Sequence, residues 1–124
     1  MGLEGGILMR VNIKRIYEPA RREDGIRVLA DRIWPRGVSK EKAAIHEWAK
    51  DITPSTGLRK WYHADPTRRW IQFKKRYEQE LKDHKESISA LRDACKNKTI
   101  TLVSAVKEPK RSHVSVLSAF LKKE

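Results

Sequence analysis

The sequence of 124 residues has a single cysteine, Cys95, and therefore cannot form an internal disulfide. This scarcity is typical of proteins that work in a reducing compartment, and we expect a cytoplasmic location. No apolar run approaches the roughly 20 residues that span a bilayer, and the opening residues are too weakly apolar for a secretory signal. We therefore expect no association with a membrane.

Motifs for several common chemistries are also missing. The four histidines lie far apart and share no ligand spacing with the cysteine, which argues against a zinc site. The phosphate-binding patterns GxxxxGK(S/T) and GxGxxG and the nucleophile pattern GxSxG do not occur, and nothing resembles a paired-carboxylate glycosidase site. We expect no metal and no cofactor, and the sequence leaves open whether the protein is an enzyme.

Positive charge is what the sequence has in excess. The 28 Lys and Arg residues against 16 Asp and Glu give a formal net charge of +12. Such a field attracts phosphates, nucleic acids and acidic partners, most strongly at low salt. The same composition also suits a solvated basic surface that only keeps the protein soluble, so charge alone does not decide the function.

Apolar and β-branched residues recur with periods that predict an α/β fold. Strands are predicted at 11–17, 26–33 and 99–106, and helices at 40–52, 56–62, 66–84, 86–96 and 112–122. The order β-β-α-α-α-α-β-α indicates a small mixed or parallel sheet with a three-stranded core flanked by helices. Residues 1–8 are expected to be a disordered or extended N-terminal extension, and residues 9–124 a single α/β domain.

The helical stretch between the second and third predicted strands is long enough for a crossover connection, so these strands are expected to be parallel. Parallel strands end at the same edge of a sheet, and sites in open α/β sheets lie beyond the carboxyl ends of the strands. The turns after Ile33 and Val106 are therefore expected to meet at one crevice.

The first of these turns, DRIWPRG, concentrates polar chemistry between a strand and a helix. The guanidinium groups of Arg32 and Arg36 can bind a carboxylate or phosphate in bidentate geometry, beside the indole of Trp34. Ser39 is expected to cap the next helix, whose free N–H groups favour an anion. Asp31 is a candidate catalytic residue, either as a base or by orienting an arginine. The alternative is a structural ion pair between Asp31 and one of the arginines below a packed tryptophan.

Two other segments supply further candidates. Lys107 ends the third predicted strand and can neutralise an anion, and His113 begins the last helix. His113 is the second candidate catalytic residue, because histidine exchanges protons near neutral pH. Ser55, Arg59 and His63, at the start of the short helix and along it, are candidate anion ligands. Helix capping alone would also explain Ser55.

The motifs DRIWPRG (31–37), SKEKA (39–43), TPSTGLRKW (53–61) and HADP (63–66) resemble the YeaO-like branch of domain of unknown function 488. The resemblance covers nearly the whole chain and implies an α/β fold, but no settled biochemical role. Longer relatives of that broader family carry a cysteine in the last strand and a Cys-His-Arg triplet at the following helix. The equivalent positions here are Ser104 and Ser112-His113-Val114. The resemblance therefore implies no thiol chemistry, and leaves a binding or acid–base role open.

Three functions follow, in this order. The first is a binding or catalytic site for a small anionic or phosphorylated ligand at the carboxyl ends of the parallel strands. The second is a nucleic-acid-binding module that uses the basic faces at 59–76 and 107–111. The third is a protein-interaction module or homodimer without a ligand of its own.

Overall fold

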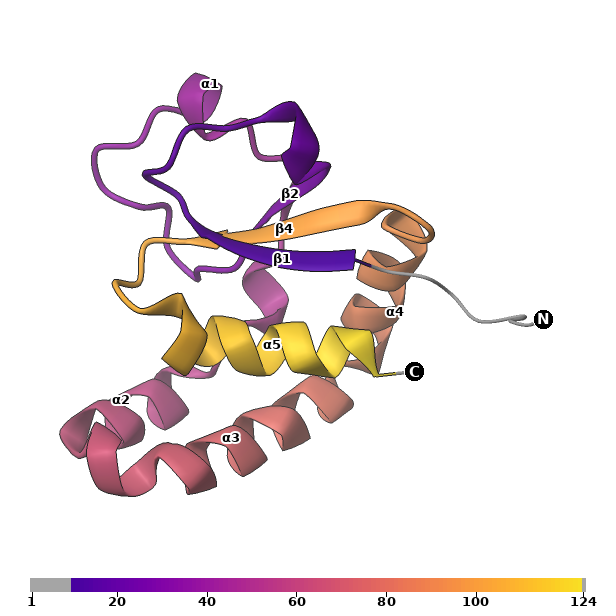
Figure 1. Ribbon diagram of the computed structural model, residues 1–124. Coiled ribbons are helices and arrows are strands. Elements are labelled where there is room, and N and C mark those ends of the chain that lie inside the picture. The colour runs from indigo at the N-terminus through magenta and orange to yellow at the C-terminus, as the bar shows by residue number, and fades with distance from the viewer. Residues whose placement is uncertain (1–9, 124) are drawn as a thin grey trace.

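A parallel four-stranded sheet forms the centre of the computed structural model, which describes residues 10–123 (Figure 1). Its strands are β1 (Arg10–Arg15), β2 (Ile26–Leu29), β3 (Glu47–Trp48) and β4 (Thr99–Ser104), in the spatial order β1-β4-β2-β3. All three neighbouring pairs are parallel, which confirms the α/β class and the parallel arrangement expected of β2 and β4. The extension expected at 1–8 lies outside the described residues.

β4 lies inside the sheet and is buried on both faces. Ile100 and Leu102 belong to the main hydrophobic core, while Val103 belongs to a smaller cluster on the other face. All three side chains are fully buried. The nearly continuous apolar run at this position predicted such an environment, because a strand covered on both faces needs apolar residues in both alternating sets.

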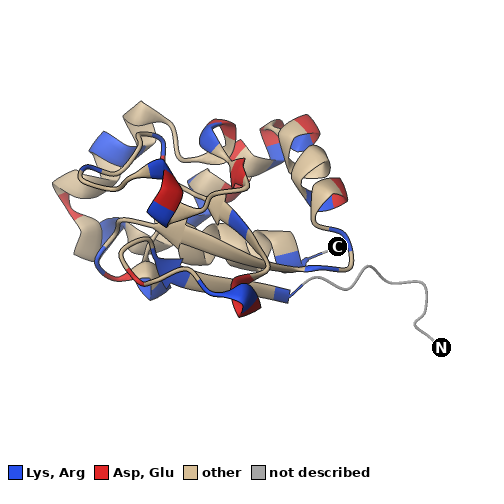
Figure 2. Cartoon of the chain, turned by 90° about the horizontal axis from the view of Figure 1, so that it is seen from above, with Lys and Arg blue, Asp and Glu red and all other residues tan. Residues whose placement is uncertain are grey.

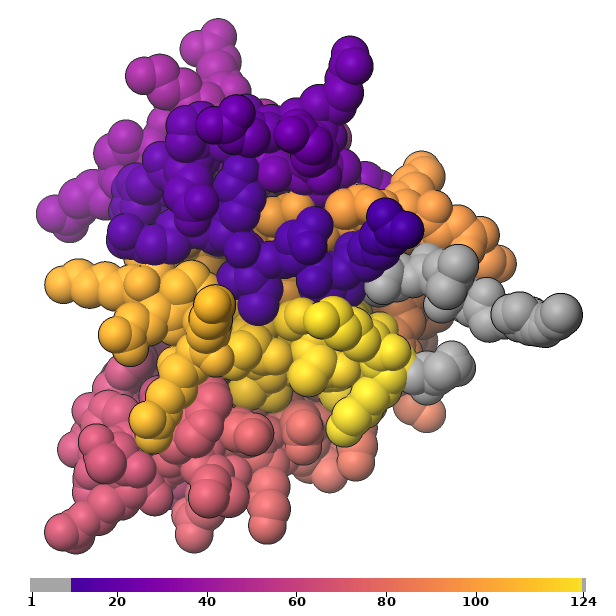
Figure 3. Space-filling view, viewed as in Figure 1, coloured from indigo at the N-terminus to yellow at the C-terminus, as the bar shows by residue number. Residues whose placement is uncertain are grey.

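The longer helices lie on the side of the sheet that carries the main core (Figure 1). They are α2 (Thr56–Ala64), α3 (Pro66–Asp83), α4 (Lys85–Ala94) and α5 (His113–Lys122). Figure 3 shows α5 between β1 and α3. The buried residues of α3 are Phe73, Tyr77 and Leu81, the stripe that their three- and four-residue spacing predicted. Within residues 10–123, no helix combines the length and the apolar character needed to cross a bilayer.

The helix predicted at 40–52 is wrong beyond its first turn. α1 spans only Lys40–Ala43, and Ala44 takes a left-handed backbone conformation (φ 49°) that ends it. The chain then forms the edge strand β3 and a short 3₁₀ turn. The cause lies in the tertiary packing. Ile45 packs against the smaller cluster and Ile52 lies in the main core, on the opposite face of the sheet. One face of a single helix could not place both side chains there. The order of elements is therefore β-β-α-β-α-α-α-β-α, with a fourth strand added to the expected three.

β2 is shorter than the sequence predicts, because it ends at Leu29 and not at Ile33. Ala30 still donates its N–H to the carbonyl oxygen of Val103 at 2.9 Å, and the chain then leaves the sheet. The carboxylate of Asp31 accepts a hydrogen bond from the backbone N–H of Ala105 at 2.8 Å, so a side chain replaces the next strand pair. Residues 31–36 are consequently a loop at the carboxyl edge of the sheet.

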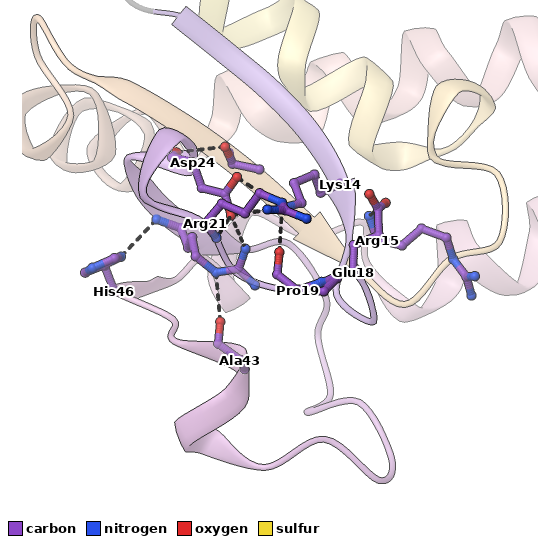
Figure 4. Close-up of polar contacts among 10 residues, drawn as sticks. Lys14, Arg15, Glu18, Pro19, Arg21, Asp24, Ala43 and His46 are labelled. Carbon is purple, nitrogen blue, oxygen red and sulfur yellow. Dashed lines mark hydrogen bonds and ion pairs between the residues drawn. The ribbon is translucent and has the colours of Figure 1, made fainter.

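The turn before β2 holds a buried ion cluster (Figure 4). Asp24 lies 3.1 Å from Nζ of Lys14 and 2.6 Å from Nη1 of Arg27, and it accepts a hydrogen bond from the backbone N–H of Arg21. Burial by itself raises the pKa of Asp24, but these hydrogen bonds and the charge of Lys14 hold the pKa below its ordinary value of 3.8. Arg27 also donates to the carbonyl oxygen of Ala43, so the cluster joins β1, β2 and α1.

Candidate functional site

A cleft of about 850 Å³ opens at the carboxyl ends of β2 and β4. Its lining comes mainly from the loop after β2, from α2 with the residues before it, and from the segment that joins β4 to α5. Figures 1 and 3 show these three segments at the same end of the molecule. The turns after β2 and β4 thus meet, as the parallel arrangement of the two strands predicted.

Eight of the ten candidate residues line this cleft: Asp31, Arg32, Trp34, Arg36, Arg59, His63, Lys107 and His113. The other two, Ser39 and Ser55, do not. The hydroxyl of Ser39 accepts a hydrogen bond from the N–H of Lys42, and the hydroxyl of Ser55 accepts one from Leu58 and donates one to Glu80. Both serines cap helices in this structure, which is the alternative that the sequence offered for Ser55.

Asp31 is held by three neighbours of the protein itself. Its Oδ1 accepts a hydrogen bond from the hydroxyl of Ser104 at 2.5 Å, its Oδ2 accepts one from the N–H of Ala105 at 2.8 Å, and Nε2 of His113 lies 3.6 Å from Oδ1. Burial by itself raises the pKa of Asp31, but His113, Ser104 and Ala105 together hold the pKa below 3.8. The carboxylate is therefore ionised at neutral pH. It contacts neither Arg32 nor Arg36 in an ion pair among the described residues, so the ion pair considered from the sequence does not form.

One ring nitrogen of His113, Nε2, faces two oxygen atoms. Its Nε2 lies 2.6 Å from the carbonyl oxygen of Ala30, and a carbonyl oxygen can only accept, so Nε2 carries a proton and donates it there. In a Ser-His-Asp triad the histidine accepts the serine proton. Here Ser104 and His113 both face the carboxylate of Asp31, and neither contacts the other in the hydrogen bonds of residues 10–123. The arrangement fixes the ring, and His113 does not activate Ser104.

The two serines at the positions of the relatives' cysteines are likewise committed to structural hydrogen bonds. The hydroxyl of Ser104 donates to Asp31 and accepts from the N–H of Val106 at 3.2 Å. The hydroxyl of Ser112 donates to the carbonyl oxygen of Pro109 at 2.8 Å and accepts from the N–H of Val114, at the start of α5. In the part of the chain that the structure describes, no three His, Cys, Asp or Glu side chains gather closely enough to hold a metal ion.

Five cationic side chains line the cleft, against two carboxylates. They are Arg32, Arg36, Arg59, Lys107 and Arg111. Among residues 10–123, none of the five lies within 4 Å of a carboxylate, and the only basic side chain that close to either cleft carboxylate is His113, beside Asp31. Lys and Arg are scattered along the whole ribbon in Figure 2, but here they converge from three separate segments. The cleft therefore has excess positive charge.

Sequence reasoning missed two residues of this site. Arg111 was assigned only to a basic surface, yet it lies above the ring of Trp70 at 5.6 Å and lines the cleft. Tyr62 was given no role from the sequence, yet its half-buried side chain also lines the cleft. Burial raises the pKa of the Tyr62 hydroxyl, and the charge of Arg111 partly offsets that rise. The spacing of Tyr62 from Arg59, three residues along one helix, was the signal available in the sequence.

The fold and the cleft define a class: a small parallel α/β domain with a cationic crevice at the ends of its strands. The chain belongs to the family described as the inactive DUF488-N3 subclade, whose model matches residues 10–124. It is 40% identical over 114 residues to the uncharacterized protein YeaO of Escherichia coli K12, covering 92% of this chain and 98% of YeaO. It is 41% identical over 112 residues to the uncharacterized protein Rv3073c of Mycobacterium tuberculosis, covering 90% and 93% of the two chains. These matches confirm the YeaO-like resemblance, and no solved structure matches the chain significantly.

Proposed function

We propose that this cleft binds a small anionic ligand, phosphorylated or carboxylated, through its arginine and lysine side chains. The observation that supports this is the set of five cleft cations without a carboxylate partner among residues 10–123. Guanidinium groups bind carboxylate or phosphate oxygens in bidentate geometry. An anion in the cleft would supply these cations with the negatively charged hydrogen-bond acceptors that no neighbouring carboxylate of residues 10–123 supplies.

Arg32 and Arg59 support the proposal most directly. The Nε atom of each is buried, and neither has a hydrogen-bond partner in the part of the chain that the structure describes. A buried donor without a partner costs about 1–3 kcal/mol. Each Nε is closed to solvent where it stands, so a ligand removes that cost only by drawing the guanidinium group toward the cleft that both side chains line.

Binding without turnover is the form of this function that the site supports best. Ser104 and Ser112 are occupied by structural hydrogen bonds, and Nε2 of His113 donates to a backbone carbonyl. The family description as inactive agrees with this interpretation. We assign positioning roles to Asp31 and His113, because together they hold the base of the loop that carries Arg32 and Arg36.

Thermal unfolding with inorganic phosphate, pyrophosphate and citrate, at ionic strength matched with chloride, tests this proposal. A ligand at a hundredfold excess over its Kd adds about 2.7 kcal/mol to the free energy of unfolding. For a chain of this size, that corresponds to a rise in Tm on the order of 10 °C. At least one of the three anions should stabilise the protein beyond chloride.

The variant Arg59→Gln should lose most of that stabilisation. Arg68→Gln is the matched control, because the Arg68 side chain is 88% exposed on α3 and does not line the cleft. Equal responses of the two variants, or no response of the wild-type protein to any of the three anions, would contradict the proposal.

The nucleic-acid module and the interaction module stay predictions from the sequence. A short oligonucleotide in the same thermal-unfolding assay distinguishes nucleic-acid binding on the basic surface from anion binding in the cleft. Binding through phosphate contacts on a general basic surface falls steeply with salt, and it should not depend on Arg59.

A further inference from the structure

One wall of the cleft places a cation beside an aromatic ring. Arg59 and Tyr62 lie three residues apart on α2, and side chains at that spacing share one face of a helix. Both line the cleft, together with Arg111 from the segment after β4. An anionic group held by these guanidinium groups is therefore next to the phenol ring.

The ring of Tyr62 is held in place from behind. It stacks on the ring of Phe73 with a centroid distance of 4.3 Å and an interplanar angle of 26°. Phe73 is only 2% exposed, whereas Tyr62 is half-buried, so the uncovered part of the Tyr62 ring borders the cleft. A ring that is already fixed offers a stacking surface with little conformational entropy left to lose on binding.

The loop after β2 adds a second flat wall. Trp34 lines the cleft, its indole N–H donates to the carbonyl oxygen of Val38 at 2.7 Å, and its ring meets Trp48 edge to face. Pro35 and Pro54 also border the cleft, although both are buried and expose little surface to it. The cleft thus has a cationic part and an apolar, flat-walled part. Its volume of about 850 Å³ far exceeds what a phosphate ion fills, and it lies within the roughly 300–1,000 Å³ typical of pockets for drug-sized ligands.

We infer that the ligand of this cleft is a nucleotide, with its phosphate on the arginines and its base stacked on Tyr62. This inference rests on the anion-binding function proposed above. Every nucleobase has a π-face that stacks on an aromatic side chain, so no base-specific contact is required. The nucleotide is either free or at the end of a nucleic-acid strand, since both present a base and a phosphate to the site.

Isothermal titration calorimetry on the full chain tests the inference with three sets of probes. They are the four ribonucleoside 5′-monophosphates, ribose 5-phosphate, and the four nucleosides. At least one monophosphate should bind roughly tenfold or more tightly than ribose 5-phosphate, the gain expected from stacking one base. A pentanucleotide with a 5′-phosphate distinguishes the two sources, because it competes with the monophosphate only if the site accepts a strand end.

Three variants test the role of the ring. Tyr62→Leu should reduce the affinity for the monophosphate to that for ribose 5-phosphate, whose own binding stays unchanged and so shows that the cleft is folded. Tyr62→Phe keeps the ring and should keep the preference. Trp61→Leu is the matched control, because Trp61 is a half-buried aromatic residue on the same helix that does not line the cleft.

The outcomes separate this inference from the function on which it rests. Equal affinities for ribose 5-phosphate and all four monophosphates would overturn the nucleotide assignment and leave anion binding intact. A preference for the monophosphate that survives Tyr62→Leu would also overturn the assignment. If neither the monophosphates nor ribose 5-phosphate bind, the nucleotide assignment is overturned, and anion binding is overturned with it only if citrate also fails to stabilise the protein. Nucleosides that bind as tightly as their monophosphates would overturn the assignment too, because the phosphate would then contribute nothing to the affinity.

Discussion

The buried carboxylate of Asp24 and the partly buried carboxylate of Asp31 are close in sequence but have opposite kinds of partners. Asp24 contacts the cations Lys14 and Arg27, so in that cluster the charges of the two signs meet each other (Figure 4). Asp31 is bound by a hydroxyl, a backbone N–H and a histidine, and the arginines of its own loop are left for other partners. The difference shows that a buried acid beside basic residues marks a structural cluster only where the protein pairs the charges. Where the cations have no such partner, the acid and the cations beside it mark a candidate binding site.

Among the variants that test this comparison, Arg27→Met is expected to change the free energy of unfolding most. Arg27 is 2% exposed and lies 2.6 Å from Asp24, so the substitution leaves a buried carboxylate without its nearest cation. We expect a loss of about 3–5 kcal/mol in the free energy of unfolding, measured by urea denaturation. A loss below about 1 kcal/mol, the range of exposed pairs, would show that the Asp24 cluster is not the structural member of the comparison.

Asp31→Ala should destabilise the protein less, by about 1–3 kcal/mol, because it leaves the N–H of Ala105 without an acceptor. Asp31→Asn should retain most of the stability, since the amide oxygen can still accept from Ala105 and the hydroxyl of Ser104 can reverse its role. Urea denaturation of both variants measures the difference. Equal losses would mean that the negative charge of Asp31, and not its hydrogen bonds, stabilises the loop.

Acidification should weaken both clusters. The folded-state pKa of each carboxyl lies below the ordinary value of 3.8, so its contribution to stability is present above that pH and is lost as the pH falls through the lower folded-state pKa. Urea midpoints from about pH 6 to about pH 2 should therefore fall most steeply below about pH 4. Asp24→Asn and Asp31→Asn should each flatten that fall. A slope unchanged in either variant would contradict the lowered pKa of that carboxyl.

The smallest loss of stability is expected for Arg59→Met. Arg59 has no carboxylate partner among the described residues, and its Nε is a buried donor without an acceptor, so its removal breaks no ion pair there. We expect a loss of no more than about 0.5 kcal/mol, or a gain in stability, because the substitution also removes the cost of the unpartnered Nε; both are measured in urea in the absence of added ligand. A loss as large as that of Arg27→Met would show that the guanidinium of Arg59 stabilises the fold, and would remove the contrast between the two regions.

Much of the fold was predictable because the responsible signals are local. The three- and four-residue spacing of Phe73, Tyr77 and Leu81 predicted α3, and the apolar run at 99–106 predicted the buried strand β4. The segment at 44–52 was wrongly predicted, since Ile45 and Ile52 pack on opposite faces of the sheet. Pairing with β2 decides that structure, and helix propensity is a weak preference by comparison.

The sequence by itself determined that the turns after β2 and β4 would meet, because parallel strands end at the same edge, and it placed eight of the ten candidate residues in segments that line the cleft. It could not determine which charges would be neutralised. Asp31 is bound by Ser104 and Ala105, more than seventy positions further along the chain, and the arginines beside it consequently have no carboxylate partner within residues 10–123. Periodicity and capping act over a few residues, whereas an ion pair depends on a few ångströms between side chains brought together by the packed sheet. For that reason, only the tertiary structure separates the structural cluster at Asp24 from the candidate binding cleft at Asp31.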